Sequence, residues 1–448
     1  MYGKGTAMLL GTQKINSANH LEIGGCDTID LAAQFGTPLY IMDEAMIRDR
    51  CRTYKSAFAS EYGDVAVAYA SKAFIVTAMC RIMDQEGLWL DVASAGELHT
   101  AKCAGFPMDR IVFHGNFKSP EELEMAVENN VACIVPDNFV ELELLSVIAE
   151  DAGKVQNIML RCNPGVDPHT HRLISTGQQD SKFGFNIKDG AAMAAVRKAI
   201  TLPGLKLAGV HCHVGSQLLD PTPFVEAAGV MANFIRQIID ETGCVIGILD
   251  MGGGAGVRYV EENHPPSIPE FAEIVSEAVI VAAAEAGIPK PKLMVEPGRS
   301  IAGEAGTTLY SIGPIKEVSI PEAPGKKTYL AVDGGLSDNP RPTMYDAIYS
   351  AMIANKAGDA PTNTYTVSGK HCETDMLIPS VLLPEARTGD LLAVQTTGAY
   401  NQAMASNYNR FTRPAVVLVR DGQADLIVRR ETLDDIVKCD VVPDRLRS

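Results

Sequence analysis

Lys72 is the first residue of this sequence whose type and position suggest chemistry. It follows Ser71 and the small and apolar run 65–70, which is typical of a parallel strand buried on both faces. A desolvated lysine at the end of such a strand can have a depressed pKa and act as an amine nucleophile, as Schiff-base chemistry requires. The alternative is an ordinary surface lysine that closes a strand.

Two later segments could bind a flat, anionic cofactor. Residues 252–254 are three consecutive glycines after an apolar run, and backbone N–H groups in such a turn can approach a phosphate closely. Glu296 and Arg299 follow the next run. A carboxylate that faces a pyridine nitrogen keeps it protonated, and a guanidinium can bind a carboxylate with two hydrogen bonds. A flexible turn and a structural ion pair are the alternatives.

The triplet His211-Cys212-His213 raises the question of a metal site. Alternate residues of a strand point to one side, so the two histidines would share a face. A catalytic zinc site needs three protein ligands, and the sequence shows no further ligand cluster, so no metal is expected. We expect one histidine to be a core residue. His213 is nearer the end of the run and is followed by Gly215 and Ser216, so we expect it to cover a flat cofactor.

Cys372 lies between His371 and Glu373. A lone cysteine is more often a small buried hydrophobic residue than a reactive thiol. The polar and charged neighbours argue against burial at this position. An accessible thiol in such a setting could donate a proton during a reaction.

Eight short apolar runs alternate with helical stretches and could position these side chains. The runs are 65–70, 88–92, 111–113, 132–135, 158–161, 207–211, 245–249 and 293–295. Nearly every run ends in polar or glycine residues, among them Asp91, His114, Arg161 and Asp250. The carboxyl ends of all strands of a (β/α)8 barrel surround one mouth. Polar or glycine residues at the end of nearly every run therefore favour a TIM-type barrel over an open doubly wound sheet.

The pattern changes after about residue 305, where short β-rich runs are separated by Pro and Gly turns. This predicts a C-terminal antiparallel β domain, with one helical exception at 345–354. The irregular N-terminal arm, residues 1–35, is expected to join this domain. The predicted organisation is therefore a barrel over 36–305 and a β domain over 1–35 and 306–448.

Composition limits the possible partners and compartment. The chain has 448 residues and a formal net charge of −16, which disfavours nucleic acid and anionic membranes. No apolar run reaches the roughly 18 residues of a membrane span, and no signal segment is evident. The ten cysteines show no paired spacing, so reduced thiols in a cytoplasmic protein are expected.

Six motifs, distributed along essentially the whole chain, resemble those of the fold-type III pyridoxal-phosphate decarboxylases, the alanine racemase-like group. They are residues 70–73, 209–216, 252–254, 296–299, 372–373 and 398–400. Within this group, two stretches resemble the diaminopimelate decarboxylase family: 163–184 and 333–346. The thiol motif is one residue shorter than that family's Cys-Glu-Ser-Gly-Asp, which leaves the role of Asp375 open.

The resemblance implies a role for each matching residue. Lys72 would bind pyridoxal 5′-phosphate as a Schiff base, His213 would stack on its ring, and Glu296 would pair with its ring nitrogen. The other implied cofactor-binding residues are Asp91, Ser216, Gly253, Gly254, Gly298, Arg299 and Tyr400. The implied substrate-binding residues are Arg299, Arg341, Tyr345, Glu373 and Tyr400. Cys372 would return a proton to the substrate in the partner's site of a homodimer.

The implied reaction is decarboxylation of meso-2,6-diaminopimelate to L-lysine and carbon dioxide. The residues favour this substrate, because Arg299 and Arg341 would repel the distal ammonium of lysine or ornithine but suit a second carboxylate. The alternatives are a carboxynorspermidine or basic amino-acid decarboxylase, and an inactive homologue that acts as a binding regulator.

Overall fold

A computed structural model describes residues 8–166, 182–319 and 326–447. Contacts divide the chain into two units, and we describe each by itself. The barrel unit contains residues 47–257 and 263–302, and the β unit contains residues 1–46, 258–262 and 303–448. The predicted boundaries were at 35/36 and 305/306. The principal difference is β4 (Leu39–Asp43), a strand that lies in the β unit.

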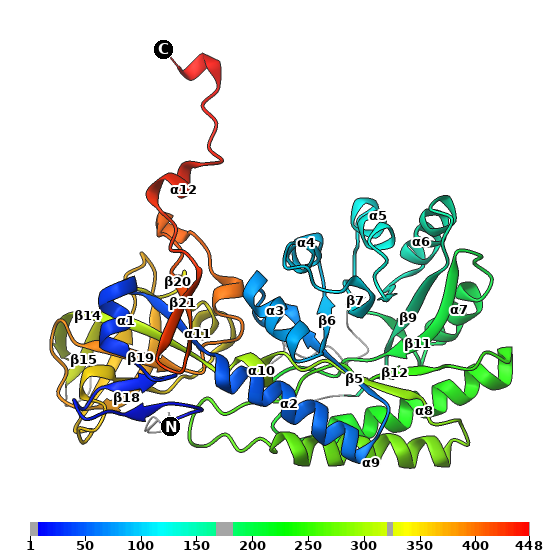
Figure 1. Ribbon diagram of the computed structural model, residues 1–448, viewed down its shortest axis with the longest axis horizontal. Helices are drawn as coiled ribbons and strands as arrows, with labels where there is room; N and C mark the ends of the chain where they lie inside the picture. Colours follow the sequence, from blue (N-terminus) through cyan, green and yellow to red (C-terminus); the bar gives the residue numbers. More distant parts are fainter. Residues whose placement is uncertain (1–7, 167–181, 320–325, 448) are drawn as a thin grey trace. The chain divides into compact units, whose positions relative to one another are not determined.

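The barrel unit is built on parallel strands in the order that a TIM-type barrel requires, which confirms the predicted fold class (Figure 1). The strands are β5 (Val65–Ala70), β6 (Trp89–Val92), β7 (Ile111–Phe113), β8 (Cys133–Ile134), β9 (Gln156–Asn163), β11 (Leu205–His211), β12 (Ile248–Asp250) and β13 (Lys292–Val295). Pairing of β13 with β5 and of β8 with β9 closes the barrel. A short additional strand, β10 (Phe185–Asn186), pairs with β9.

Helices surround the barrel strands in space; α2 precedes β5, and the others follow barrel strands in the sequence (Figure 1). They are α2 (Glu44–Glu61), α3 (Thr77–Gln85), α4 (Ala95–Cys103), α5 (Pro120–Glu128), α6 (Phe139–Asp151), α7 (Ala191–Ala199), α8 (Thr222–Thr242), α9 (Ile268–Glu285) and the short α10 (Arg299–Ala302). Local start signals explain their positions, because Ser119 and Ser267 form capping boxes with Glu122 and Glu270. Asp43, directly before α2, accepts a hydrogen bond from the Met46 amide at 3.1 Å, as a helix N-cap does.

The barrel interior is filled by side chains from neighbouring strands. Ala66, Val112, Cys133, Met159 and Met294 belong to one buried cluster. Burial of these residues inside the barrel, and of Val67 and Tyr69 on the other face of β5, explains why the strands read as continuous apolar runs. The strands therefore end in polar residues only where the chain reaches the barrel mouth.

The β unit contains a nine-stranded sheet. Its main path follows the order β18-β17-β15-β14-β4-β20-β21, and β19 pairs with β14 and β16. The strands are β14 (Gly306–Ser319), β15 (Lys326–Val332), β16 (Ala351–Ile353), β17 (Asn363–Ser368), β18 (Met376–Leu383), β19 (Leu391–Gln395), β20 (Ala415–Arg420) and β21 (Gln423–Val428), with β4. Most pairs are antiparallel, but β15–β17 and β4–β20 are parallel, so the sheet is mixed.

The described part of the N-terminal arm, residues 8–35, does not add a strand to this sheet. Its strands β1 (Lys14–Ile15), β2 (Leu21–Ile23) and β3 (Cys26–Asp27) form a small sheet of their own. A helix that the sequence reading missed, α1 (Thr28–Phe35), is capped by Asp27. Leu21 and Ile23 pack in one buried cluster with Leu309 and Val417, so the arm joins the β unit through its core.

The predicted helix at 345–354 is wrong. The helix in this region is α11 (Arg341–Tyr345), with Pro342 in its first turn and the left-handed residue Asp346, φ 51°, after its end. Residues Ala351–Ile353 instead form β16, which pairs with β19. Tertiary strand pairing overrides the local helical pattern here.

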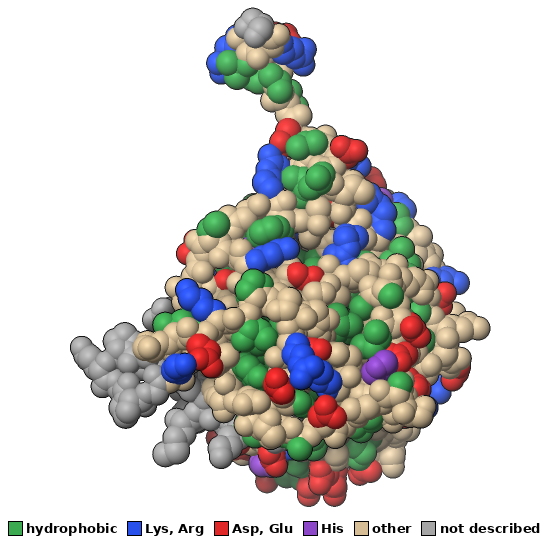
Figure 2. Space-filling model, turned by 90° about the vertical axis from the view of Figure 1, so that its left-hand side faces the viewer, with side chains coloured by type: hydrophobic (Ala, Val, Ile, Leu, Met, Phe, Trp, Pro, Cys, Tyr) green, Lys and Arg blue, Asp and Glu red, His purple; other side chains and the backbone are tan. Residues whose placement is uncertain are grey.

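The surface of the β unit shown in Figure 2 mixes acidic and basic side chains with scattered apolar ones. Its last segment, which includes α12 (Leu433–Val437), carries exposed Leu433, Val441 and Leu446. All ten cysteines are free thiols, and Cys103, Cys372 and Cys439 are exposed. Among the described residues, no helix is long and apolar enough to cross a membrane.

Candidate active site

The lysine at the end of β5 is paired with an aspartate from the next strand. The chain turns from β5 into a single 3-10 turn, Ser71–Ala73, which carries Lys72. Its Nζ lies 2.7 Å from Oδ2 of Asp91 in β6. The Asp91 side chain is 1% exposed, whereas that of Lys72 is 43% exposed. The amine is therefore oriented by a buried carboxylate and remains accessible to a reactant.

A second group of polar side chains surrounds Glu296, directly after β13. His114 Nε2 lies 2.7 Å from Glu296 Oε1, and His211 Nε2 lies 3.4 Å from Oε2. Donor atoms of these three residues and of Asp250 all lie within 4.8 Å of one another, and all four side chains are buried. No further ligand cluster was predicted beside His211, but barrel closure brings His114, Asp250 and Glu296 close to it.

In this group, Asp250 and His211 are neutral and Glu296 is ionised. Burial and the nearby Glu296 raise the pKa of Asp250 well above its usual value, so Asp250 keeps a proton. Burial also lowers the pKa of His211 to about 4, so this imidazole is neutral. Burial opposes the charge on Glu296 as well, but His114 and His211 outweigh it, and the pKa of Glu296 lies well below its usual value. Glu296 is therefore the ionised member.

The triple glycine after β12 is packed too closely for any other residue. A Cβ atom at Gly252 would overlap the Cys212 carbonyl, one at Gly253 the Glu296 carbonyl, and one at Gly254 the Gly215 carbonyl. Gly252 and Gly254 also have positive φ, at 67° and 128°. The turn therefore needs glycine for packing as well as for access. Gly298 likewise lies against Ala70, beside the lysine turn.

The other barrel residues predicted for the site lie around these two groups. Arg299 Nη2 donates a hydrogen bond to Ser216 Oγ at 2.9 Å, so this arginine is tied to the loop after β11. His213 is half-buried, and burial followed by the charges of Lys72 and Arg161 lowers its pKa well below its usual value. A neutral imidazole suits stacking on a flat ring.

Sequence reasoning assigned no role to Glu97, whose carboxyl group is influenced by the charges of Asp91 and Lys72. Its Oε2 accepts a hydrogen bond from the Ala93 amide at 2.6 Å. Burial, with Asp91 as a further cause, raises the pKa of Glu97 to about 7. In the sequence, Glu97 looks like an ordinary acidic residue in the first turn of a helix. Only the influence of Asp91 and Lys72 in the folded chain marks it as a candidate site residue.

The barrel residues fit pyridoxal phosphate. Glu296 Oε1, Asp91 Oδ1 and Ser71 Oγ are buried without a hydrogen-bond partner among the described residues, since His114 Nε2 is close to Glu296 but not aligned with it. Buried polar atoms without partners are uncommon in folded proteins and often mark a ligand site. An ionised Glu296 can pair with a protonated ring nitrogen, and Lys72 is accessible for a Schiff base.

A second set of predicted residues lies in the β unit. Arg341, at the start of α11, is 5% exposed, and its Nη1 donates to the hydroxyls of Tyr259 at 2.9 Å and Tyr349 at 2.7 Å. Among the described residues of this unit, no carboxylate forms a salt bridge with Arg341. Two neutral phenols therefore orient a buried cation that can still bind an anion. Sequence reasoning missed both tyrosines.

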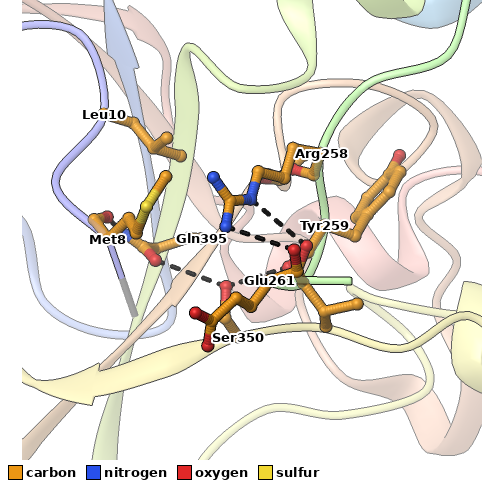
Figure 3. Close-up of a pocket in the computed structure, with 9 residues that line it drawn as sticks. Met8, Leu10, Arg258, Tyr259, Glu261, Ser350 and Gln395 are labelled. Atoms are coloured by element: carbon orange, nitrogen blue, oxygen red, sulfur yellow. Dashed lines mark hydrogen bonds between the residues drawn. The ribbon is translucent and has the colours of Figure 1, made fainter. Parts of the chain in front are cut away.

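Tyr259 reaches this arginine from a short segment, 258–262, that belongs to the β unit. Hydrogen bonds around a small cavity fix the segment (Figure 3). The Ser350 hydroxyl donates to the Tyr259 carbonyl at 2.9 Å, and Arg258 Nε donates to the Val260 carbonyl at 3.3 Å. The cavity thus lies beside the backbone that holds Tyr259 in place.

The remaining predicted residues are also placed. Cys372 and Glu373 are exposed, as their neighbours suggested, and Tyr345 is half-buried at the end of α11. Tyr400 is half-buried with φ 61°, a left-handed conformation that is rare for a bulky residue and often found at binding sites. The predicted motif residues 169–171 and 181 lie outside the described residues.

Comparison with known proteins identifies the relatives of this chain. Residues 44–303 match the family described as "Pyridoxal-dependent decarboxylase, pyridoxal binding domain". The diaminopimelate decarboxylase of Bacillus subtilis is 49% identical over 97% of this chain and 98% of its own length. A crystal structure of diaminopimelate decarboxylase from M. jannaschii in complex with L-lysine is 35% identical, with a TM-score of 0.88, over 98% of this chain and 100% of that one. The Helicobacter pylori enzyme complexed with L-lysine is 30% identical, with a TM-score of 0.83, over 92% and 98%.

Proposed function

The chain belongs to the pyridoxal-dependent decarboxylases and, among them, to the diaminopimelate decarboxylase family, and we propose that it converts meso-2,6-diaminopimelate to L-lysine and carbon dioxide. The observation that carries the choice of substrate is Arg341, a buried guanidinium held by two phenols. Diaminopimelate differs from lysine by a second carboxylate, which such a cation can bind with two hydrogen bonds.

The proposed cofactor is pyridoxal 5′-phosphate. When bound, it supplies an electron sink for the bond that breaks to release carbon dioxide. Lys72 would hold its aldehyde carbon, oriented by Asp91, and Glu296 would keep its ring nitrogen protonated. His213 would cover the ring. Ser216, Arg299 and Tyr400, with the amides of Gly253, Gly254 and Gly298, would surround the phosphate.

The β unit would supply the groups that recognise the substrate and return a proton. Arg341 and Tyr345 would bind the distal carboxylate together with Arg299, and Glu373 would bind the distal ammonium. Cys372 would donate the proton that replaces the lost carboxyl group. Exposure of Cys372 and Glu373 is consistent with a loop that serves the partner's site in a homodimer, and we place the enzyme in the cytoplasm.

The test is release of carbon dioxide from meso- and LL-diaminopimelate, lysine and ornithine. We expect turnover of the meso isomer, and L-lysine as product. Turnover of lysine or ornithine without turnover of diaminopimelate would contradict the proposal and support the basic amino-acid alternative. Cofactor binding is read separately from an absorbance band near roughly 420 nm, typical of this cofactor on a lysine, which Lys72→Ala should lose. Absence of that band in the unaltered protein would support the inactive homologue.

A further inference from the structure

Three loops of the β unit meet at one buried histidine, His371. We name them the substrate loop (334–341), the cysteine loop (369–376) and the stacking loop (406–411). His371 Nδ1 lies 2.5 Å from Asp375 Oδ2, and its Nε2 accepts a hydrogen bond from the Ser337 amide at 3.3 Å. These two partners place the ring proton on Nδ1. The ring stacks on Tyr408, with centroids 5.9 Å apart and planes 13° apart, and it meets Phe411 in a T-shaped contact with centroids 4.9 Å apart.

The Asp375 carboxylate links the cysteine loop to the substrate loop. Its Oδ1 accepts from the Leu336 amide at 2.9 Å, and its Oδ2 accepts from the His371 amide at 3.2 Å as well as from the ring. Gly335 and Gly369 enclose the carboxylate, because a Cβ atom at either position would overlap it. Only glycine therefore fits at these two positions beside the carboxylate.

The stacking loop fixes the exposed end of the cysteine loop. Asn409 Oδ1 accepts a hydrogen bond from the Cys372 amide at 3.0 Å, and the Tyr408 hydroxyl donates to Glu373 Oε1 at 2.7 Å. The Ser406 amide donates to the Ser337 carbonyl at 2.9 Å, which joins the stacking loop to the substrate loop. Each loop is thus bonded to the other two.

We propose that His371 and Asp375 are positioning residues that hold the substrate loop and the cysteine loop as one body. Arg341 stands at the end of one loop, and Cys372 and Glu373 stand in the other, so the pair would fix Arg341 in its own site and Cys372 and Glu373 in the position from which they serve the partner's site. The functional half of this inference rests on the proposed function. It gives Asp375 the role that the shortened motif left open.

The test uses Asp375→Asn in the full chain with bound cofactor. Asparagine has the shape of aspartate but a single acceptor oxygen, so it cannot serve both the Leu336 amide and His371. We expect hydrogen exchange of the Leu336 and Ser337 amides to become about tenfold faster, the effect of one lost hydrogen bond. We also expect kcat/KM for diaminopimelate to fall about tenfold, with an unchanged cofactor dissociation constant. Tyr408→Phe keeps the ring stack on His371 but removes the hydroxyl that donates to Glu373. It should lower kcat/KM without changing the exchange of the Leu336 amide.

The matched control is Asp27→Asn, because Asp27 forms a similar pair with His20, at 2.8 Å, elsewhere in the β unit. It should change neither the exchange of the loops nor kcat/KM. Unchanged exchange at Leu336 and Ser337 in folded Asp375→Asn would overturn the coupling. Faster exchange with unchanged kcat/KM would overturn the positioning role. If the unaltered protein does not decarboxylate diaminopimelate, the proposed function fails, and exchange alone still decides whether the loops are coupled.

Discussion

The placement of a single proton between Asp250 and Glu296 leads to opposite expectations for two isosteric variants. Asp250→Asn keeps the neutral state that burial imposes on Asp250, and its carbonyl can still accept from the Gly252 amide at 2.8 Å. Its amide group can donate to Glu296 in place of the acid proton. We therefore expect kcat/KM to stay within about threefold of the unaltered enzyme, or about 0.65 kcal/mol.

Glu296→Gln would remove the proposed ionised partner of the cofactor's ring nitrogen. A hydrogen bond to a charged group contributes about 1.5 to 3 kcal/mol, so we expect kcat/KM to fall roughly 10- to 150-fold. The assay is release of carbon dioxide from meso-diaminopimelate, with the cofactor spectrum recorded for each variant. Loss of activity in Asp250→Asn together with retention in Glu296→Gln would refute the proton assignment.

The pH dependence of thermal stability tests the protonation of Asp250 independently of activity. The folded-state pKa of Asp250 lies above its unfolded value near 3.8, so its contribution is complete below pH 3.8 and is lost as pH rises. Asparagine does not lose a proton. Cofactor-free Asp250→Asn should therefore melt at a higher temperature than the unaltered protein at pH 8, with a smaller difference at pH 4. The reverse order would contradict a protonated Asp250.

Three further predictions concern the substrate, the proton donor and pH. Arg341→Lys should raise KM for diaminopimelate at least about tenfold, because an ammonium cannot form the bidentate pair, while the cofactor spectrum stays unchanged. Cys372→Ala should lower kcat at least about tenfold if the thiol is the acid, and near-normal turnover would remove it from that role. The pKa of Glu97 is raised to about 7, so its stabilising contribution is complete below pH 4.5 and is lost as pH rises through 7. In thermal melts, Glu97→Gln should therefore gain stability relative to the unaltered protein at pH 8 but not at pH 4.

The barrel could be predicted because its strands are buried on both faces and its helices carry local start signals. The run 65–70 coincides with β5, and the glycine turn and Glu296 follow the strands that were expected to carry them. The proposed roles of Lys72 and of the cofactor-binding residues rest on such local features, so the sequence alone was enough to propose them.

Other parts of the site depend on long-range contacts that no local pattern records. His114 and Asp250 follow different strands and meet at Glu296 only through barrel closure. Tyr259 comes from a segment that follows the seventh strand, yet it orients Arg341 in the β unit. The partners of His371 likewise lie in three loops. Sequence spacing could name these residues as polar but could not assign their contacts.

The position of β4 has a consequence for the synthesis of the protein. Leu39 pairs on one side with Leu309 and on the other with Ala415, so both neighbours of this strand are made much later. At roughly 5 to 20 residues per second, the ribosome needs on the order of 20 to 75 seconds to travel from Leu39 to Ala415. During that time, the apolar strand β4 has two unpaired edges, because its neighbours β14 and β20 have not yet been synthesised. Nascent chains should therefore recruit holding chaperones until β20 emerges.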